Sequence, residues 1–175
     1  MTREETPMPQ PHEIAVISWL VGTWVGVGVG GYPSVDEFRF AQEVTFANDG
    51  RPMLAYSSRS WLLDEDGNRS RPLAFESGFW RLRPDNRLEV LLSHPLGYSE
   101  VWVGDITVTS ISESAVTGAK IELQTDVVAR TESAKEYAAG IRLYGLVDGD
   151  LLWAFDMAAV GQPMQSHLSA RLVKV

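Results

Sequence analysis

The sequence predicts an all-β protein, a single antiparallel up-and-down β-barrel of about ten strands with a short N-terminal helix. Extended segments with period-2 alternation recur roughly every 8–14 residues, and short turns of Asn, Asp, Gly and Pro join them. Helical periodicity is confined to the start of the chain, so the alternation of strands and helices that builds a parallel sheet is missing. A closed barrel also removes the exposed edges that such a row of strands would otherwise leave.

The N-terminal part divides into two segments. Residues 1–11 are rich in proline and lack an apolar run, so we expect a disordered lead-in there and one barrel domain over residues 12–175. A helix is predicted from His12 to Val21, because Ile14, Ile17 and Val21 recur at helical spacing and Gly22 follows.

The first predicted strand lies within residues 22–34 and has an unusual composition. Its valines share one face, whereas Gly26, Gly28 and Gly30 share the other. A glycine face suits a sharply bent strand or the close approach of a bulky group. The following strands are expected at residues 37–46, 53–63, 73–83, 87–93, 98–103, 106–111, 120–129, 137–147, 151–159 and 164–175.

Composition excludes several classes of function. The 175 residues contain no cysteine, which excludes disulfides, thiolate nucleophiles, iron–sulfur clusters and thiolate-ligated haem. The net charge of −8 argues against nucleic acid or an anionic membrane surface as a partner. No apolar run approaches the roughly 18 residues of a membrane span, and no signal peptide precedes the barrel, so a cytoplasmic location is expected.

Few residues point to chemistry by their type and position. A Ser-His-Asp triad, a carboxylate pair, a three-histidine zinc site and a calcium loop at residues 64–68 all lack a local signature. His167 stands at the head of the last predicted strand. A structural role is the simplest interpretation of a lone histidine, but one neutral imidazole also suffices to hold haem iron inside an aromatic barrel.

Several motifs carry a resemblance to a known family. Residues Gly22 to Gly28 are similar to the Gly-x-Trp-x-Gly-x-Gly motif of the nitrobindin family, and Tyr32-Pro33-Ser34 stands where that family has Tyr-Pro-Thr. Its other landmarks follow in the same order at Glu76 to Arg81, Gly161 to Met164 and His167 to Leu172. The resemblance covers about residues 14–175, and the motif residues singled out are Gly22, Trp24, Gly26 and Gly28.

The resemblance implies a haem protein that acts on reactive nitrogen species. Members of the family bind one ferric haem b per chain, isomerise peroxynitrite to nitrate and bind nitric oxide reversibly. By this similarity His167 is the axial iron ligand and Ser34 contacts the haem. Ala74 stands where relatives often have histidine. A homodimer is a further hypothesis.

Two other functions fit the same fold. An intracellular carrier of a fatty acid or another small apolar ligand would be favoured by an internal arginine pair, and the predicted strands carry Arg39, Arg59, Arg81 and Arg142. A haem-based gas sensor without turnover would use the same histidine.

Overall fold

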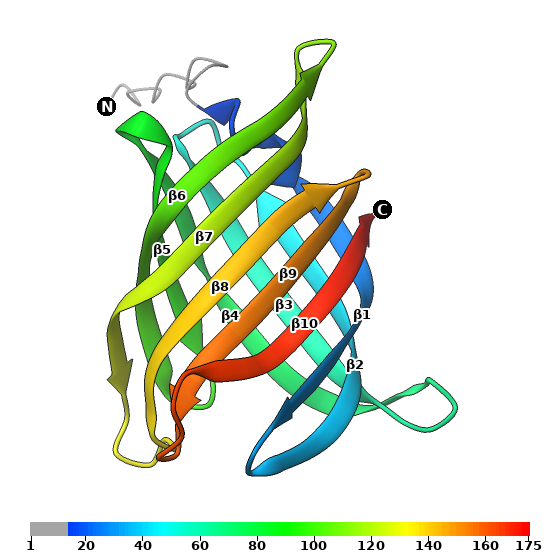
Figure 1. The fold of residues 1–175 in the computed structure, drawn as a ribbon, viewed down its shortest axis with the longest axis vertical. Helices are drawn as coiled ribbons and strands as arrows, with labels where there is room; N and C mark the ends of the chain where they lie inside the picture. Colours follow the sequence, from blue (N-terminus) through cyan, green and yellow to red (C-terminus); the bar gives the residue numbers. More distant parts are fainter. Residues whose placement is uncertain (1–13) are drawn as a thin grey trace, which may run out of the picture.

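The structure, a computed structural model that describes residues 14–175, is a closed antiparallel β-barrel (Figure 1). Each strand pairs with its neighbours in the sequence, and β1 pairs with β10 to close the barrel. The predicted all-β, up-and-down architecture is therefore confirmed. The strands are β1 (Gly22–Tyr32), β2 (Val35–Ala47), β3 (Met53–Leu63), β4 (Arg69–Arg83), β5 (Arg87–His94), β6 (Tyr98–Ser112), β7 (Ala115–Arg130), β8 (Tyr137–Val147), β9 (Asp150–Ala159) and β10 (Gln165–Lys174).

The described part of the expected N-terminal helix ends in a short 3-10 helix. The lead-in over residues 1–11 and the first residues of the predicted helix lie outside the described residues. In the described part, Ile14 is helical, a turn follows, and the 3-10 helix η1 (Ser18–Leu20) comes next, with i→i+3 hydrogen bonds to the carbonyls of Ile14, Ile17 and Ser18. This segment packs on the barrel end, where Leu20 is buried and its carbonyl accepts a 2.8 Å hydrogen bond from the Trp24 indole. A second 3-10 helix, η2 (Pro84–Asn86), joins β4 to β5.

The two strands expected at residues 98–103 and 106–111 form the single strand β6. The segment between them makes no turn, because Gly104 and Asp105 pair with Leu123 and Glu122 of β7. A Cβ atom at Gly104 would collide with the Glu122 carbonyl oxygen, so this glycine permits close approach of two backbones.

The interior is packed with aromatic side chains along the barrel, from Trp24 near the start of β1 to Trp102, which contacts Phe155. Trp24, Trp80 and Trp102 are fully buried and lie on different strands. The Lys174 ammonium lies 4.8 Å from the centre of the Trp24 ring and donates to the Trp19 carbonyl oxygen at 2.8 Å, which ties β10 to the N-terminal segment. None of the helices in residues 14–175 is long and apolar enough to cross a membrane.

The end of the barrel opposite η1 is irregular. The β1–β2 ladder shifts register between Gly30 and Tyr32, and the β10–β9 ladder shifts between Ser166 and Leu168. The first shift leaves Gly31 of β1 opposite two residues of β2, Asp36 and Glu37, so this bulge lies in β2, whereas the second leaves His167 of β10 without a partner in β9. Bulges of this kind turn a side chain or carbonyl away from its regular direction and are frequent at barrel rims and functional sites. This end, where β1 finishes and β10 starts, lies at the bottom of Figure 1.

Candidate functional site

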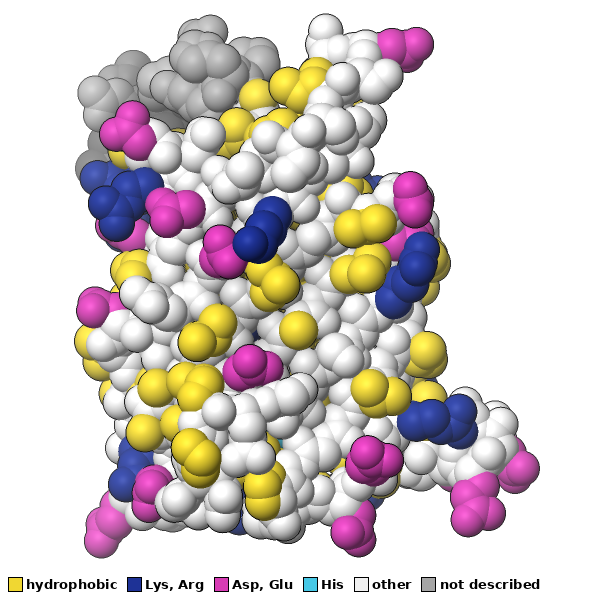
Figure 2. All heavy atoms as spheres, in the orientation of Figure 1, with side chains coloured by type: hydrophobic (Ala, Val, Ile, Leu, Met, Phe, Trp, Pro, Cys, Tyr) yellow, Lys and Arg dark blue, Asp and Glu magenta, His cyan; other side chains and the backbone are white. Residues whose placement is uncertain are grey.

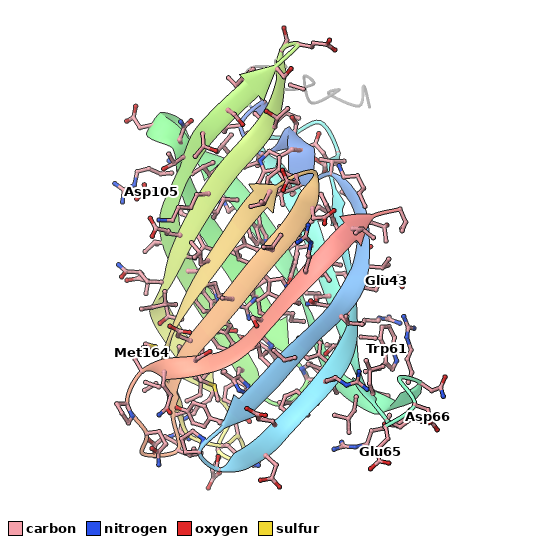
Figure 3. The ribbon with its side chains drawn as sticks, turned by 45° about the vertical axis from the view of Figure 1, so that its right-hand side comes forward. Glu43, Trp61, Glu65, Asp66, Asp105 and Met164 are labelled. Carbon is pink, nitrogen blue, oxygen red and sulfur yellow. The ribbon has the colours of Figure 1, made fainter. Side chains whose placement is uncertain are left out.

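A cavity of about 1160 Å³ opens at the irregular end of the barrel. Its lining comes from the end of β1, the start of β2, the β3–β4 hairpin and the start of β10. Figure 3 shows Glu65 and Asp66 near the tip of that projecting hairpin, at the same end of the barrel as Met164, which precedes β10. Apolar lining residues include Phe38, Leu62 and Leu168, and polar ones include Arg39, Asp64 and Gln165.

His167 enters this cavity with one ring nitrogen already occupied. Its Nδ1 atom lies 3.0 Å from the carbonyl oxygen of Gly31, so the bulged His167 of β10 meets the end of β1 just beyond the last pair of their ladder. Burial lowers the pKa of His167, and the Gly31 hydrogen bond only partly opposes this effect. The ring is therefore neutral at neutral pH, donates its Nδ1 proton to Gly31 and keeps the Nε2 lone pair for a ligand.

Two aromatic rings hold the imidazole from the sides. The ring of Tyr32 meets it edge to face with centroids 5.5 Å apart, and the ring of Phe155 does so at 5.8 Å. Tyr32 is itself fixed, because its hydroxyl donates to the Met157 carbonyl oxygen at 3.0 Å and accepts the Ala159 N–H at 3.0 Å. These contacts leave the imidazole little freedom to rotate.

The other residues of the sequence prediction lie at different places. Gly22, Trp24, Gly26 and Gly28 are outside the cavity lining. A Cβ atom at Gly28 would collide with the Phe40 ring and the Ser169 carbonyl oxygen, so this glycine serves barrel packing. Ser34 is exposed on the turn between β1 and β2, flanked by the lining residues Pro33 and Val35, and is not itself part of the lining. Its contact with a cofactor stays a prediction.

Sequence reasoning missed the residues that orient His167. The Gly31 carbonyl and the Tyr32 and Phe155 rings act through a bulge and through packing between distant strands, and strand alternation signals neither. The lining residue Phe38 could have been found, because it shares the inward parity of Phe40 in the alternating pattern of β2.

Ala74 faces open space in the barrel. It pairs with Ser60 on the inward parity of β4, as Glu76 pairs with Ser58, yet it is exposed. His94 is held by the carboxylates of Glu76 and Glu100, and His12 lies outside the described residues. Among residues 14–175 there is no group of three His, Asp or Glu side chains suited to a metal ion.

Comparison with known families identifies the cofactor of this site. The sequence profile of a family described as "THAP4-like, heme-binding beta-barrel domain" matches residues 13–174, nearly the whole chain. The chain belongs to this haem-binding β-barrel family. Haem is accordingly the cofactor, as the resemblance of the motifs predicted.

Named relatives of this THAP4-like barrel agree with that assignment. It is 51% identical over 158 residues to a protein of Nocardioides sp. named "Peroxynitrite isomerase", covering 90% of each chain. It is 44% identical over 188 residues to a "Ferric nitrobindin-like protein" of Kineococcus radiotolerans, covering 99% of this chain and 97% of that protein. The crystal structure of Rv2717c from M. tuberculosis superposes with a TM-score of 0.86 at 32% identity, covering 95% of this chain and 99% of that one.

The residues of the THAP4-like barrel fit a haem. The macrocycle is flat and apolar, with anionic propionates on one edge and an iron that accepts a neutral imidazole. The cavity supplies each complement: the Nε2 atom of His167, the apolar side chains of Phe38, Leu62 and Leu168, and the cationic Arg39. This donor set has no thiolate or second histidine in the lining, so it provides one protein ligand to the iron.

Proposed function

We propose that this protein is a ferric-haem peroxynitrite isomerase, which converts peroxynitrite to nitrate, with His167 as the axial ligand of one haem b per chain. The observation that carries the proposal is the geometry of His167. Its Nδ1 atom is bound to the Gly31 carbonyl oxygen at 3.0 Å, and its ring borders the cavity, so only Nε2 is available to a metal. Relatives with about half of their residues identical carry the name of this activity.

The protein's own residues have three tasks in this proposal. His167 binds the iron, and Gly31 fixes the tautomer of its ring. The apolar side chains around the cavity exclude bulk water from the bound anion. A ferric haem held by His167 would supply the chemistry that isomerises peroxynitrite to nitrate. Ser34, at the rim, is assigned a contact with the haem.

The activity is tested by stopped-flow decay of peroxynitrite, with the nitrate yield measured after each reaction. The haem-loaded protein is expected to accelerate the decay and raise the nitrate yield, whereas apoprotein and the His167→Ala variant are expected to do neither. The control is Lys120→Ala, a change at a half-exposed side chain on β7 whose ammonium pairs only with Glu122, and it is expected to keep the activity. Equal decay with and without haem would refute the proposal.

The alternative functions make different demands on the barrel. A fatty-acid carrier would hold the carboxylate with a pair of internal arginines, but the cavity lining contains only Arg39. The buried guanidinium of Arg142 already binds Glu76, and Arg59 and Arg81 are exposed outside the lining. This arrangement speaks against the carrier. A gas sensor would use the same haem site, and the nitrate yield separates it from the isomerase.

Three finer statements belong to the same proposal. Reversible binding of nitric oxide at the ferric haem is expected and would appear as a shift of the Soret band. A cytoplasmic location is expected and is tested by cell fractionation.

A homodimer is supported by exposed valines on β1 and β10. Val27, Val29 and Val173 are 60%, 56% and 47% exposed, and sedimentation velocity tests whether they form an interface. Figure 2 shows hydrophobic side chains spread over one outer face and interrupted by charged ones.

A further inference from the structure

An ion pair is buried inside the barrel and is not explained by packing alone. The Arg142 guanidinium donates two hydrogen bonds to the carboxylate of Glu76, at 2.8 and 2.9 Å. The Tyr56 hydroxyl donates to the same carboxylate at 2.6 Å. Replacing such a pair by apolar residues is often neutral or stabilising, so its presence calls for a role beyond stability.

The ion pair continues into a second carboxylate. His94 lies between Glu76 and Glu100, with its Nδ1 atom 3.4 Å from a Glu76 oxygen and its Nε2 atom in contact with Glu100. The Tyr137 hydroxyl donates to the other Glu100 oxygen at 2.6 Å. The network therefore joins strands β3, β4, β5, β6 and β8 through polar contacts.

Phe155 connects this network to the cavity. The Arg142 guanidinium carbon lies 4.9 Å from the centre of the Phe155 ring and 4.9 Å from that of Trp102. The Phe155 ring packs edge to face against His167, with centroids 5.8 Å apart and planes 64° apart. Tyr137 also touches Phe155, with ring centroids 6.3 Å apart. One aromatic ring thus separates the buried cation from the imidazole.

We infer that Phe155, clamped by the Arg142 guanidinium, is a positioning residue that fixes the plane of the His167 imidazole. This inference rests on the proposed function, in which His167 ligates the haem iron. The hydrogen bond to Gly31 fixes one atom of the imidazole ring, and a ring held at one atom can still tilt. Edge contacts from Tyr32 and Phe155 remove that freedom.

The choice of arginine follows from the same geometry. A guanidinium is planar, so it can face the Phe155 ring while its two N–H groups bind the Glu76 carboxylate in parallel. A lysine ammonium in the same place would keep the charge but lose the bidentate contact and the flat surface. The network therefore holds the Phe155 ring at a fixed position. The substitution Arg142→Lys tests this role, because it keeps the charge and removes the planar group.

The first test needs no haem. In apoprotein labelled with 15N-histidine, the Nδ1 proton of His167 is expected to be visible by NMR and slow to exchange with water, since Gly31 accepts it. Phe155→Leu is expected to accelerate that exchange about tenfold or more. Phe46→Leu is the matched control, because Phe46 packs on Tyr56 and Trp80 and not on His167, and it is expected to leave the exchange unchanged. Equal exchange in the wild type and Phe155→Leu would overturn the inference.

The second test concerns Arg142 and uses the haem-loaded protein. Two variants are compared with Phe155→Leu. One is Arg142→Lys, and the other is the double variant Glu76→Leu/Arg142→Met, which leaves no unpaired carboxylate buried. Both are expected to change the rhombicity of the ferric electron paramagnetic resonance spectrum in the same direction as Phe155→Leu. If a variant of Arg142 that folds gives the wild-type spectrum, Arg142 does not position Phe155. Retention of the wild-type spectrum by His167→Ala would instead refute the proposed ligand, so the two failures are distinguishable.

Discussion

At the scale of single residues, the site depends on two positions that lie outside the regular ladders. The carbonyl of a strand residue normally accepts a hydrogen bond from the neighbouring strand, but the ladder between β1 and β10 ends at Gly30 and Leu168, so the Gly31 oxygen is available to the His167 ring. The result is an imidazole with a defined tautomer and a low pKa, which are the properties a metal ligand needs. Gly31 and His167 are thus a functional pair that is separated by most of the sequence.

The glycines of β1 are expected to differ sharply in their tolerance of alanine. A Cβ atom at Gly28 would collide with the Phe40 ring and the Ser169 carbonyl oxygen, whereas one at Gly31 meets nothing closer than 3.6 Å. We expect Gly28→Ala to lower the free energy of unfolding by about 3 kcal/mol, as overpacking does, and Gly31→Ala to change it by less than about 1 kcal/mol. Urea denaturation of both variants checks this, and equal losses would contradict the packing role of Gly28.

At the scale of secondary-structure elements, β4 and β8 are joined by the ion pair between Glu76 and Arg142. Removing one partner leaves an uncompensated charge in the barrel. We expect Arg142→Met alone to cost about 3–5 kcal/mol of unfolding free energy, and Glu76→Leu/Arg142→Met to recover most of that loss. Thermal or urea unfolding measures both, and an additive loss in the double variant would contradict the coupling.

The same ion pair predicts how stability depends on pH. Burial alone would raise the pKa of Glu76, but the Arg142 guanidinium and further hydrogen bonds lower it from 4.5 to about 2. The carboxylate therefore stabilises the fold fully above about pH 4.5, and this contribution is lost as the pH falls toward 2. The unfolding temperature of the wild type is expected to fall more steeply in that range than that of Glu76→Gln. Parallel curves would show that Glu76 does not contribute.

At the scale of the whole molecule, stability depends on closing the barrel. The last strand, β10, supplies both the closing ladder with β1 and the residue His167. We expect a chain that ends at Pro163 to lose cooperative unfolding and the near-ultraviolet circular dichroism of its packed tryptophans. Deletion of Val175 alone, a residue that is 74% exposed, is the control and is expected to keep both. Native-like spectra from the shorter chain would show that closure is dispensable.

The barrel could be predicted from the sequence much better than its site. Extended runs that end at turn residues located strands such as β3 and β8 to the residue, because Asp64 to Asn68 and Asp148 to Asp150 mark where each strand ends. The same signal failed for β6, where Gly104 marks a close backbone contact and not a turn. His167 was found through a motif, but the Gly31 carbonyl, Phe155 and the Arg142 network depend on which strands meet across the barrel, and local patterns carry no such information.

The most direct test of the central claim is a titration of purified apoprotein with hemin, followed by the Soret band. The wild type is expected to bind one equivalent and to show the spectrum of an imidazole-ligated ferric haem. His167→Ala is expected to lose that spectrum and to regain it when free imidazole is added, because the cavity that holds the ring remains. If His167→Ala binds hemin with the wild-type spectrum in the absence of imidazole, His167 is not the iron ligand.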